Sequence, residues 1–91
     1  MPERRVTIGS RPGLHARPAA LFVQAVATST ASATLTEGDV TVDAASILAV
    51  MSLGASQGDE VLLRTEGAEA DQALGELGEL LESDLDTVPA P

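Results

Sequence analysis

The 91-residue chain contains no cysteine, lysine, tryptophan or tyrosine, and it has a single histidine and a single aromatic residue. Without cysteine, a disulfide framework and thiolate chemistry are both excluded. One histidine without cysteine also excludes the common zinc-ligand sets, so we expect no metal site. The lone aromatic residue, Phe22, excludes the stacking of bases on several aromatic side chains that single-strand nucleic-acid binders use.

Positive charge is also scarce and is unevenly distributed. Five arginines stand against 14 acidic residues, which gives a formal net charge of −9. Such a charge argues against nucleic acid and anionic membranes as partners. Four of the arginines lie in the first 17 residues, and no basic residue follows Glu66. This distribution predicts a locally positive edge on an acidic body, or an acidity that simply aids solubility.

No stretch of the sequence has the character of a membrane span or a signal peptide. Residues 18–36 carry no charge, but Gln24 interrupts their apolar first half and the second half is rich in Ser and Thr. Glu3 and Arg17 fit poorly with a signal peptide. We therefore expect one soluble, cytoplasmic domain over residues 1–91, with an ordered core at about 4–82 and a frayed tail at 83–91.

The apolar periodicity predicts four strands and three helices in the order βαββαβα. The expected strands are 4–8, 33–36, 40–42 and 60–65, and the expected helices are 16–27, 47–53 and 70–81. Residues 37–39 and 57–59 supply turns, Ser46 is the expected N-cap of the short helix, and Gly54 is its expected terminator. Threonines that alternate with Val and Leu indicate one covered and one solvated sheet face, as in a two-layer α/β sandwich.

Helical spacing predicts which side chains of the two long helices face the core. In the last helix, Gly75 and Gly78 are expected to cost up to about 1 kcal/mol each relative to alanine. The expected core residues are Ala19, Phe22, Val23 and Val26 in the first helix, and Ala70, Leu74, Leu77 and Leu81 in the last. The expected outward residues of the first helix are Arg17, Ala20, Leu21 and Gln24.

Residues 13–19, Gly-Leu-His-Ala-Arg-Pro-Ala, place the single histidine at the start of the first helix. If His15 is the N-cap, the backbone amides of Ala16 and Arg17 point toward its ring, where a phosphoryl group is well placed. The positive helix end disfavours the imidazolium and keeps the ring nucleophilic. The Arg17 guanidinium would stabilise the phosphorylated ring. The alternatives are that His15 merely caps or packs at the helix start and that Arg17 is a solvated surface residue.

The motif at 13–19, together with Ser-Ile-Leu-Ala-Val-Met-Ser-Leu-Gly at 46–54, resembles the histidine-containing phosphocarrier (HPr) family of the bacterial sugar phosphotransferase system. The resemblance covers roughly residues 6–81. It implies an antiparallel sheet of order 1-4-2-3 with three helices on one face. It also implies that His15 accepts a phosphoryl group on Nδ1 from enzyme I and passes it to IIA domains of sugar permeases, that Arg17 helps to hold the phosphate, and that no metal or cofactor is needed.

The resemblance further implies a docking surface around His15 and a regulatory site. The docking positions are Ala20, Leu21, Gln24, Ile47, Leu48 and Met51. For Ile47 and Leu48 a place in the core is the alternative, and Val50 and Leu53 are expected in the core. Ser46 matches the position that a regulatory serine kinase phosphorylates in many Gram-positive relatives; its alternative role is that of an N-cap alone.

The sequence departs from the family at the motif and on the helices. Pro12 replaces the Ser, Asn or Asp that often precedes the glycine of the motif. Lysines that relatives commonly carry on the first two helices are absent, so electrostatic steering toward acidic partners is expected to be weaker and to depend on Arg11 and Arg17. The positions without them are Gln24, Ala27, Ala45 and Ala49.

The sequence favours a monomeric phosphoryl-group carrier over an independent enzyme, because it has no second histidine and no paired base. Three alternatives stay open. The first is a carrier in a nitrogen-related or dihydroxyacetone-kinase relay. The second is a regulatory protein-binding module that is not phosphorylated on histidine. The third is a generic small α/β domain with a coincidental resemblance.

Overall fold

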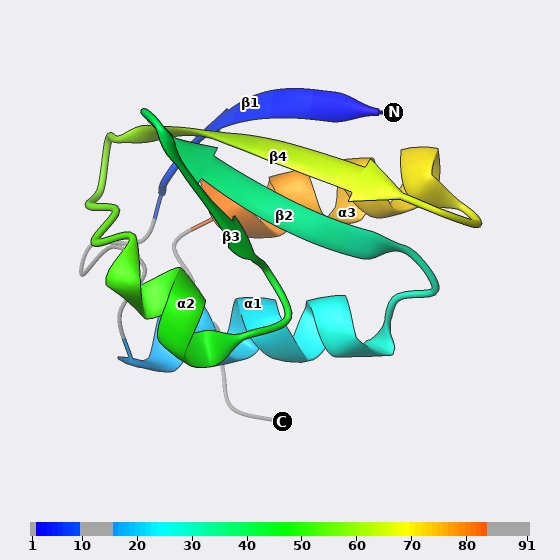
Figure 1. Cartoon of the computed structure of the whole chain (residues 1–91), viewed down its shortest axis with the longest axis horizontal. Helices are drawn as coiled ribbons and strands as arrows, with labels where there is room; N and C mark the ends of the chain where they lie inside the picture. The colour runs from blue at the N-terminus through cyan, green and yellow to red at the C-terminus, as the bar shows by residue number, and fades with distance from the viewer. Residues whose placement is uncertain (1, 10–15, 84–91) are drawn as a thin grey trace.

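The computed structural model describes residues 2–9 and 16–83, and it has the predicted element order (Figure 1). The elements are β1 (Glu3–Thr7), α1 (Ala16–Thr28), β2 (Ser32–Glu37), β3 (Val40–Asp43), α2 (Ile47–Ser52), β4 (Glu60–Glu66) and α3 (Ala70–Glu82). Every predicted element is present, and the bounds differ from the predicted ones by one residue or not at all. The first strand begins and ends one residue earlier than predicted, at Glu3 and Thr7.

The four strands form one antiparallel sheet in the order β1-β4-β2-β3, as the family resemblance implies. Strand β4 pairs with β1 on one side and with β2 on the other, and β3 is added at the β2 edge. Helix α3 packs on β1 and β4, while α1 contacts both α2 and α3 (Figure 1). The fold is therefore the predicted open-faced α/β sandwich, in which the helices cover one face of the sheet.

The two faces of the sheet differ because the strands alternate between apolar and polar side chains. Along β4, Val61, Leu63 and Thr65 are buried, whereas Arg64 is exposed. The open face instead carries cross-strand polar pairs, which stabilise a solvated face modestly. These pairs are Arg64 Nη2–Glu3 Oε2 at 2.8 Å, Arg5 Nη1–Glu60 Oε1 at 3.4 Å, and the hydroxyls of Thr36 and Thr41 at 2.8 Å.

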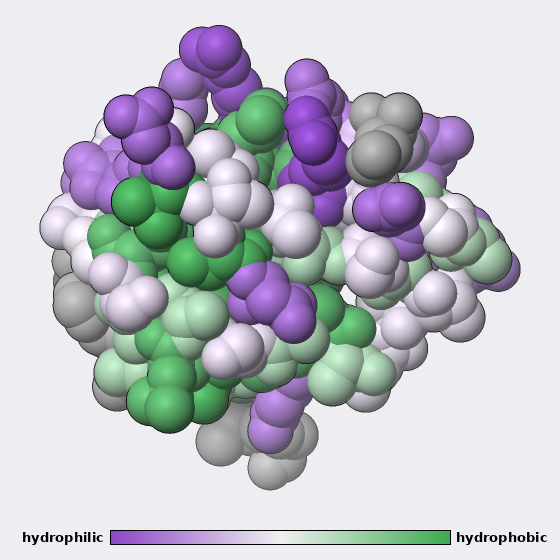
Figure 2. All heavy atoms as spheres, in the orientation of Figure 1, coloured by the Kyte–Doolittle hydropathy of each residue, from purple (hydrophilic) through white to green (hydrophobic). Residues whose placement is uncertain are grey.

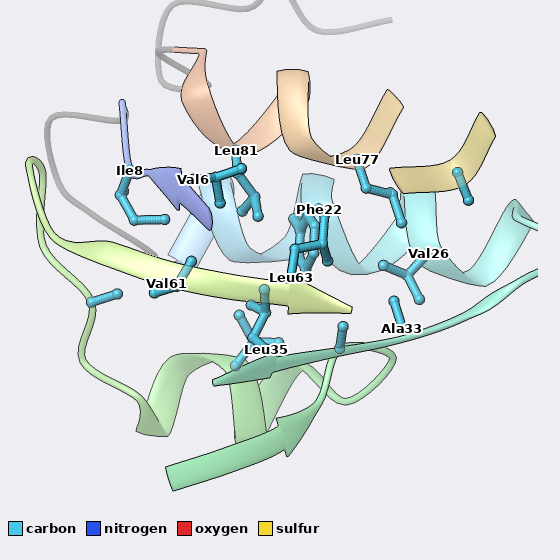
Figure 3. Packing of buried hydrophobic residues seen from close by; sticks show 14 of the residues in the cluster. Val6, Ile8, Phe22, Val26, Ala33, Leu35, Val61, Leu63, Leu77 and Leu81 are labelled. Carbon is cyan, nitrogen blue, oxygen red and sulfur yellow. The ribbon is translucent and has the colours of Figure 1, made fainter. Parts of the chain in front are cut away.

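The core lies between the sheet and the two long helices (Figure 3). Phe22, the only aromatic residue, is fully buried there together with Leu35 and Leu63 from the two central strands. Ala19 and Val26 are buried as predicted, but Val23 is half-buried and packs against the edge of the core. In α3 the predicted face is confirmed, with Leu74 half-buried, and it also includes Ala73 and Gly78.

Thr65 is the single polar side chain among residues 2–9 and 16–83 that is fully buried. Its hydroxyl donates to the backbone carbonyl of Ala70 at 2.7 Å. This bond satisfies a polar group that would otherwise cost free energy in the core. It also ties the end of β4 to the first turn of α3.

The end of β1 is fixed to the end of α3 by backbone contacts. The N–H of Gly9 donates to the carbonyl of Leu81 at 3.0 Å, and a Cβ built at Gly9 would collide with the backbone carbonyl of Glu82. Arg4 also binds the Glu82 carboxylate, with 2.8 Å between Nη2 and Oε1. Only glycine therefore fits at position 9 without displacing the end of α3.

The two glycines of α3 differ in what surrounds them. A Cβ at Gly78 would lie 2.8 Å from Arg4 Nη1, so this glycine makes room for the guanidinium that binds Glu82. A Cβ at Gly75 would meet nothing within 4 Å. The cost to the helix that the sequence predicts is therefore offset by packing at Gly78, whereas nothing in the structure offsets it at Gly75.

We predict opposite effects for alanine at two glycines. Gly75→Ala should raise the free energy of unfolding by about 0.5–1 kcal/mol, because alanine is the better helix former and meets no obstacle. Gly9→Ala should lower the free energy of unfolding by about 1–3 kcal/mol, because the backbone of α3 must move. Urea denaturation of both variants beside the parent chain measures the two effects. A Gly9→Ala protein as stable as the parent would contradict the close contact between β1 and α3.

Candidate functional site

The structure places the second half of the histidine motif in the first turn of α1. The helix begins at Ala16; Arg17 is exposed and Pro18 is fully buried. Proline costs little in a first helical turn, where the backbone N–H has no partner within the helix. His15 lies outside the described residues, as do Arg11, Pro12 and Gly13, so the predicted N-cap role of His15 stays a prediction.

The start of α1 has the charge pattern that suits a bound anion. The first turn contains no acidic residue, and its one charged side chain is the exposed Arg17. A helix N-terminus carries a positive partial charge from its unpaired backbone N–H groups. No carboxylate of this turn therefore repels a phosphoryl group bound at the helix start. Among residues 2–9 and 16–83, no group of three or more His, Cys, Asp or Glu side chains is placed to hold a metal ion.

Helix α2 has the predicted cap and the predicted terminator. Ser46 is extended, with φ −106° and ψ 114°, and its Oγ accepts a hydrogen bond from the N–H of Ala49 at 3.3 Å. The helix ends at Ser52, and Gly54 follows the C-cap Leu53 with a φ of +66°. Since six residues form less than two turns, the helix depends on its cap and on its packing rather than on propensity.

The burial of the apolar residues of α2 tests the alternative that places them in the core. Val50 is fully buried, and Leu53 packs half-buried against the core, as predicted. Ile47 is 39% exposed and Leu48 is 79% exposed, so the alternative that places them in the core is wrong. A helix this short buries one stripe of side chains, and in α2 Val50 occupies that stripe.

The remaining docking positions lie on the same two helices. Gln24 is exposed, whereas Ala20, Leu21 and Met51 are half-buried. They come from α1 and α2, which pack against each other. Figure 2 shows hydrophobic residues gathered over α2, at the lower left of the view. Below, the docking face means the six positions Ala20, Leu21, Gln24, Ile47, Leu48 and Met51.

Two hydrogen bonds near the start of α2 and at the end of β1 could not be expected from the sequence motifs. The side chain of Asp43 accepts from the N–H of Ala45 at 2.9 Å and so turns the chain from β3 into the cap of α2. The Gln57 amide donates to the carbonyl of Gly9 at 3.3 Å, just before the segment that leads to His15. An Asp whose side chain accepts from the N–H two residues later forms a local turn that can be recognised in the sequence. The Gln57 contact joins residues 48 apart and has no such signal.

None of the helices described within residues 2–9 and 16–83 is long and apolar enough to cross a membrane.

Known proteins with the same sequence pattern also have the same fold. Residues 2–83 match a family model described as the PTS HPr component phosphorylation site. The chain is 42% identical over 90 residues to the phosphocarrier protein HPr of Streptomyces coelicolor, covering 98% of this chain and 97% of that protein. It is 36% identical over 85 residues to the HPr-like protein Crh of Bacillus subtilis, covering 93% and 100%.

A solved structure gives the same result in three dimensions. The crystal structure of HPr from Thermoanaerobacter tengcongensis superimposes with a TM-score of 0.89 at 39% identity, and the match covers 98% of this chain and 100% of that one. The family model, the relatives and the sheet order therefore agree over nearly the whole chain. The chain belongs to the HPr family of phosphocarrier proteins of the phosphotransferase system.

Proposed function

We propose that this chain carries phosphoryl groups from enzyme I to the IIA domains of sugar permeases through a phosphohistidine at His15. The observation that carries the proposal is the family motif at 13–19, in which the single histidine directly precedes the residue where α1 begins. The first turn of that helix carries an exposed arginine and no carboxylate. The carrier would act in the cytoplasm as a monomeric single domain, between catalysts that are other proteins.

The transfer is a displacement at phosphorus. The lone pair on Nδ1 of the neutral imidazole attacks the phosphoryl group of the donor; the N–P bond forms, and the bond to the donor breaks with its electron pair leaving on the donor. Attack through Nδ1 requires that the ring proton is on Nε2. In the second transfer the acceptor of the IIA domain attacks the same phosphorus, and the electron pair returns to Nδ1. The chain ends each cycle unchanged.

We predict that His15 takes up one acid-labile phosphate. Incubation with phosphoenolpyruvate and enzyme I of the same organism should raise the intact mass by one phosphoryl group, and mild acid should remove it, because a phosphorus–nitrogen bond is labile there. His15→Ala should stay unmodified while retaining the circular dichroism of the parent chain. An unmodified parent chain beside a phosphorylated enzyme I would contradict the carrier role and favour a regulatory binding module. Acceptance by IIA domains or by a dihydroxyacetone-kinase relay distinguishes the two kinds of carrier.

Arg17 is proposed to hold the transferred phosphate. A guanidinium offers several N–H donors in a fixed fork that fits phosphate oxygens, and each hydrogen bond to a charged group contributes about 1.5–3 kcal/mol. Arg17 is itself exposed in the first turn of α1, on the surface where a partner must bring the phosphoryl group.

We predict that Arg17→Ala lowers kcat/KM for transfer from enzyme I roughly ten- to a hundredfold. Arg17→Lys should keep part of the rate, because lysine keeps the charge but loses the fork. Arg5→Ala is the matched control, since it also removes one arginine but from the open face of the sheet, where the Arg5 side chain is 77% exposed. Stopped-flow transfer kinetics measure all three. Equal losses in Arg17→Ala and Arg5→Ala would mean that Arg17 acts through net charge alone.

Ser46 is proposed as a regulatory phosphorylation site for a serine kinase. The residue is half-buried at the N-cap of α2 and directly precedes the exposed Ile47 and Leu48. A phosphate on its Oγ would place negative charge beside the docking face. Like charge at the rim of an interface slows the encounter of two proteins.

We predict that two substitutions at Ser46 separate its structural role from this charge effect. Ser46→Ala should lower the free energy of unfolding by about 1 kcal/mol, because the hydrogen bond to Ala49 is lost. Ser46→Asp should keep the stability, since Asp is an equally good N-cap, and should raise the KM of enzyme I for the carrier severalfold. Denaturation and transfer assays give the two values. An unchanged KM in Ser46→Asp would leave Ser46 as a cap alone.

A further inference from the structure

The two helices that form the docking face are almost free of charge. Helix α1 has 13 residues and α2 has six, and Arg17 is the single charged residue among them. All 14 acidic residues of the chain lie elsewhere in the sequence. Those within the described residues lie on the strands, in the connections and along α3. The docking face is therefore a neutral area on a body that carries a formal net charge of −9.

The same area exposes apolar side chains. Among residues 2–9 and 16–83, three large hydrophobic residues are exposed: Val40, Ile47 and Leu48. Two of them are consecutive at the start of α2, and Leu48 at 79% is the most exposed of the three. An apolar pair that a folded helix turns outward, beside the half-buried Leu21 and Met51, is typical of a surface that another protein covers.

The approach to this pair and the neighbouring helix are also uncharged. Ala45 before α2 is exposed and Ala49 within α2 is half-buried, and Gln24 is exposed on α1, the helix that packs against α2. None of them offers a counter-charge. A carboxylate on a partner, placed against these positions, would lose its hydration without gaining an ion pair, which costs free energy. It would also approach a chain of the same sign of net charge.

We propose that the proteins which dock here present an apolar patch without acidic groups opposite Gln24 and Ala49. Association is then driven by burial of Leu48 and its apolar neighbours. The proposal rests on the function proposed above and specifies the chemistry of the partner surface. The partner is then a phosphoryl-transferring protein whose docking patch is uncharged, like the docking face of this chain.

A pair of charge insertions tests the patch directly. Gln24→Lys adds a positive charge on the docking face; Gln72→Lys adds the same charge at an exposed position of α3. Both variants change the net charge equally, so their difference isolates the local effect. We expect enzyme I of the same organism to have a KM for Gln24→Lys that equals or exceeds its KM for Gln72→Lys. A KM for Gln24→Lys several times lower would reveal an acidic group opposite this position and overturn the proposal.

Ionic strength and a truncation at Leu48 give the second readout. Raising the ionic strength from about 0.01 M to about 0.1 M shortens the Debye length from about 30 Å to about 10 Å. We expect the KM of the parent chain to change by no more than about twofold over this range, because the attraction between Arg17 and the phosphoryl group is the single attraction at α1 and α2 that salt screens. Leu48→Ala should raise KM roughly tenfold at either salt concentration, since apolar burial drives the encounter. A parent KM that rises severalfold with salt contradicts the proposal.

The outcomes separate this proposal from the function on which it rests. If His15 is phosphorylated but KM rises severalfold with salt, or is several times lower for Gln24→Lys than for Gln72→Lys, the apolar partner surface is contradicted and the carrier function stands. If a phosphorylated enzyme I does not phosphorylate the chain at all, both the carrier function and the apolar partner surface are contradicted. Circular dichroism of each variant confirms that a change in KM does not come from unfolding.

Discussion

The alternation of side chains along β4 is the constraint on which the rest of the structure depends. Because β4 pairs with both β1 and β2, its register sets which residues of three strands face the helices. Val61, Leu63 and Thr65 point into the core, and a slip of one residue would replace them with Leu62 and Arg64. The two long helices then have one face of the sheet to cover, and α2 takes its place against α1 and β3.

Contacts at Gly9, after β1, and at the start of α1 fix the chain on both sides of the segment that bears the histidine. Gly9, the last described residue before that segment, is bound to Leu81 through its N–H and to Gln57 through its carbonyl. After the segment, α1 begins at Ala16 and is secured by the buried Pro18 and Phe22. Fixing the two ends of a segment reduces the entropy lost when its residues are ordered. Under the function proposed above, residues that carry no reactive group would thus contribute to transfer.

Most of the fold follows from periodicity, because each strand and helix here has a buried face with its own spacing. The cap at Ser46 and the terminator at Gly54 follow from local chemistry in the same way. What the sequence does not reveal depends on residues distant along the chain. The room that Gly78 leaves for Arg4 and the bond from Gln57 to Gly9 join separate elements. The exposure of Leu48 has a local cause: Val50 occupies the buried side of the short helix α2, and the spacing of its apolar residues does not decide which side is buried.

Helix α1 shows how this fold allows partner chemistry to vary without loss of stability. Its inward side chains, among them Ala19, Phe22 and Val26, are buried in the core, whereas Arg17 and Gln24 face outward. Exchanging one outward residue for another of similar helix propensity leaves every core contact in place and changes stability by a few tenths of a kcal/mol at most. Folding therefore leaves the charge of this face free to vary. A chain whose two docking helices carry a single charge, Arg17, should be paired with proteins whose docking surfaces offer apolar contacts in place of carboxylates.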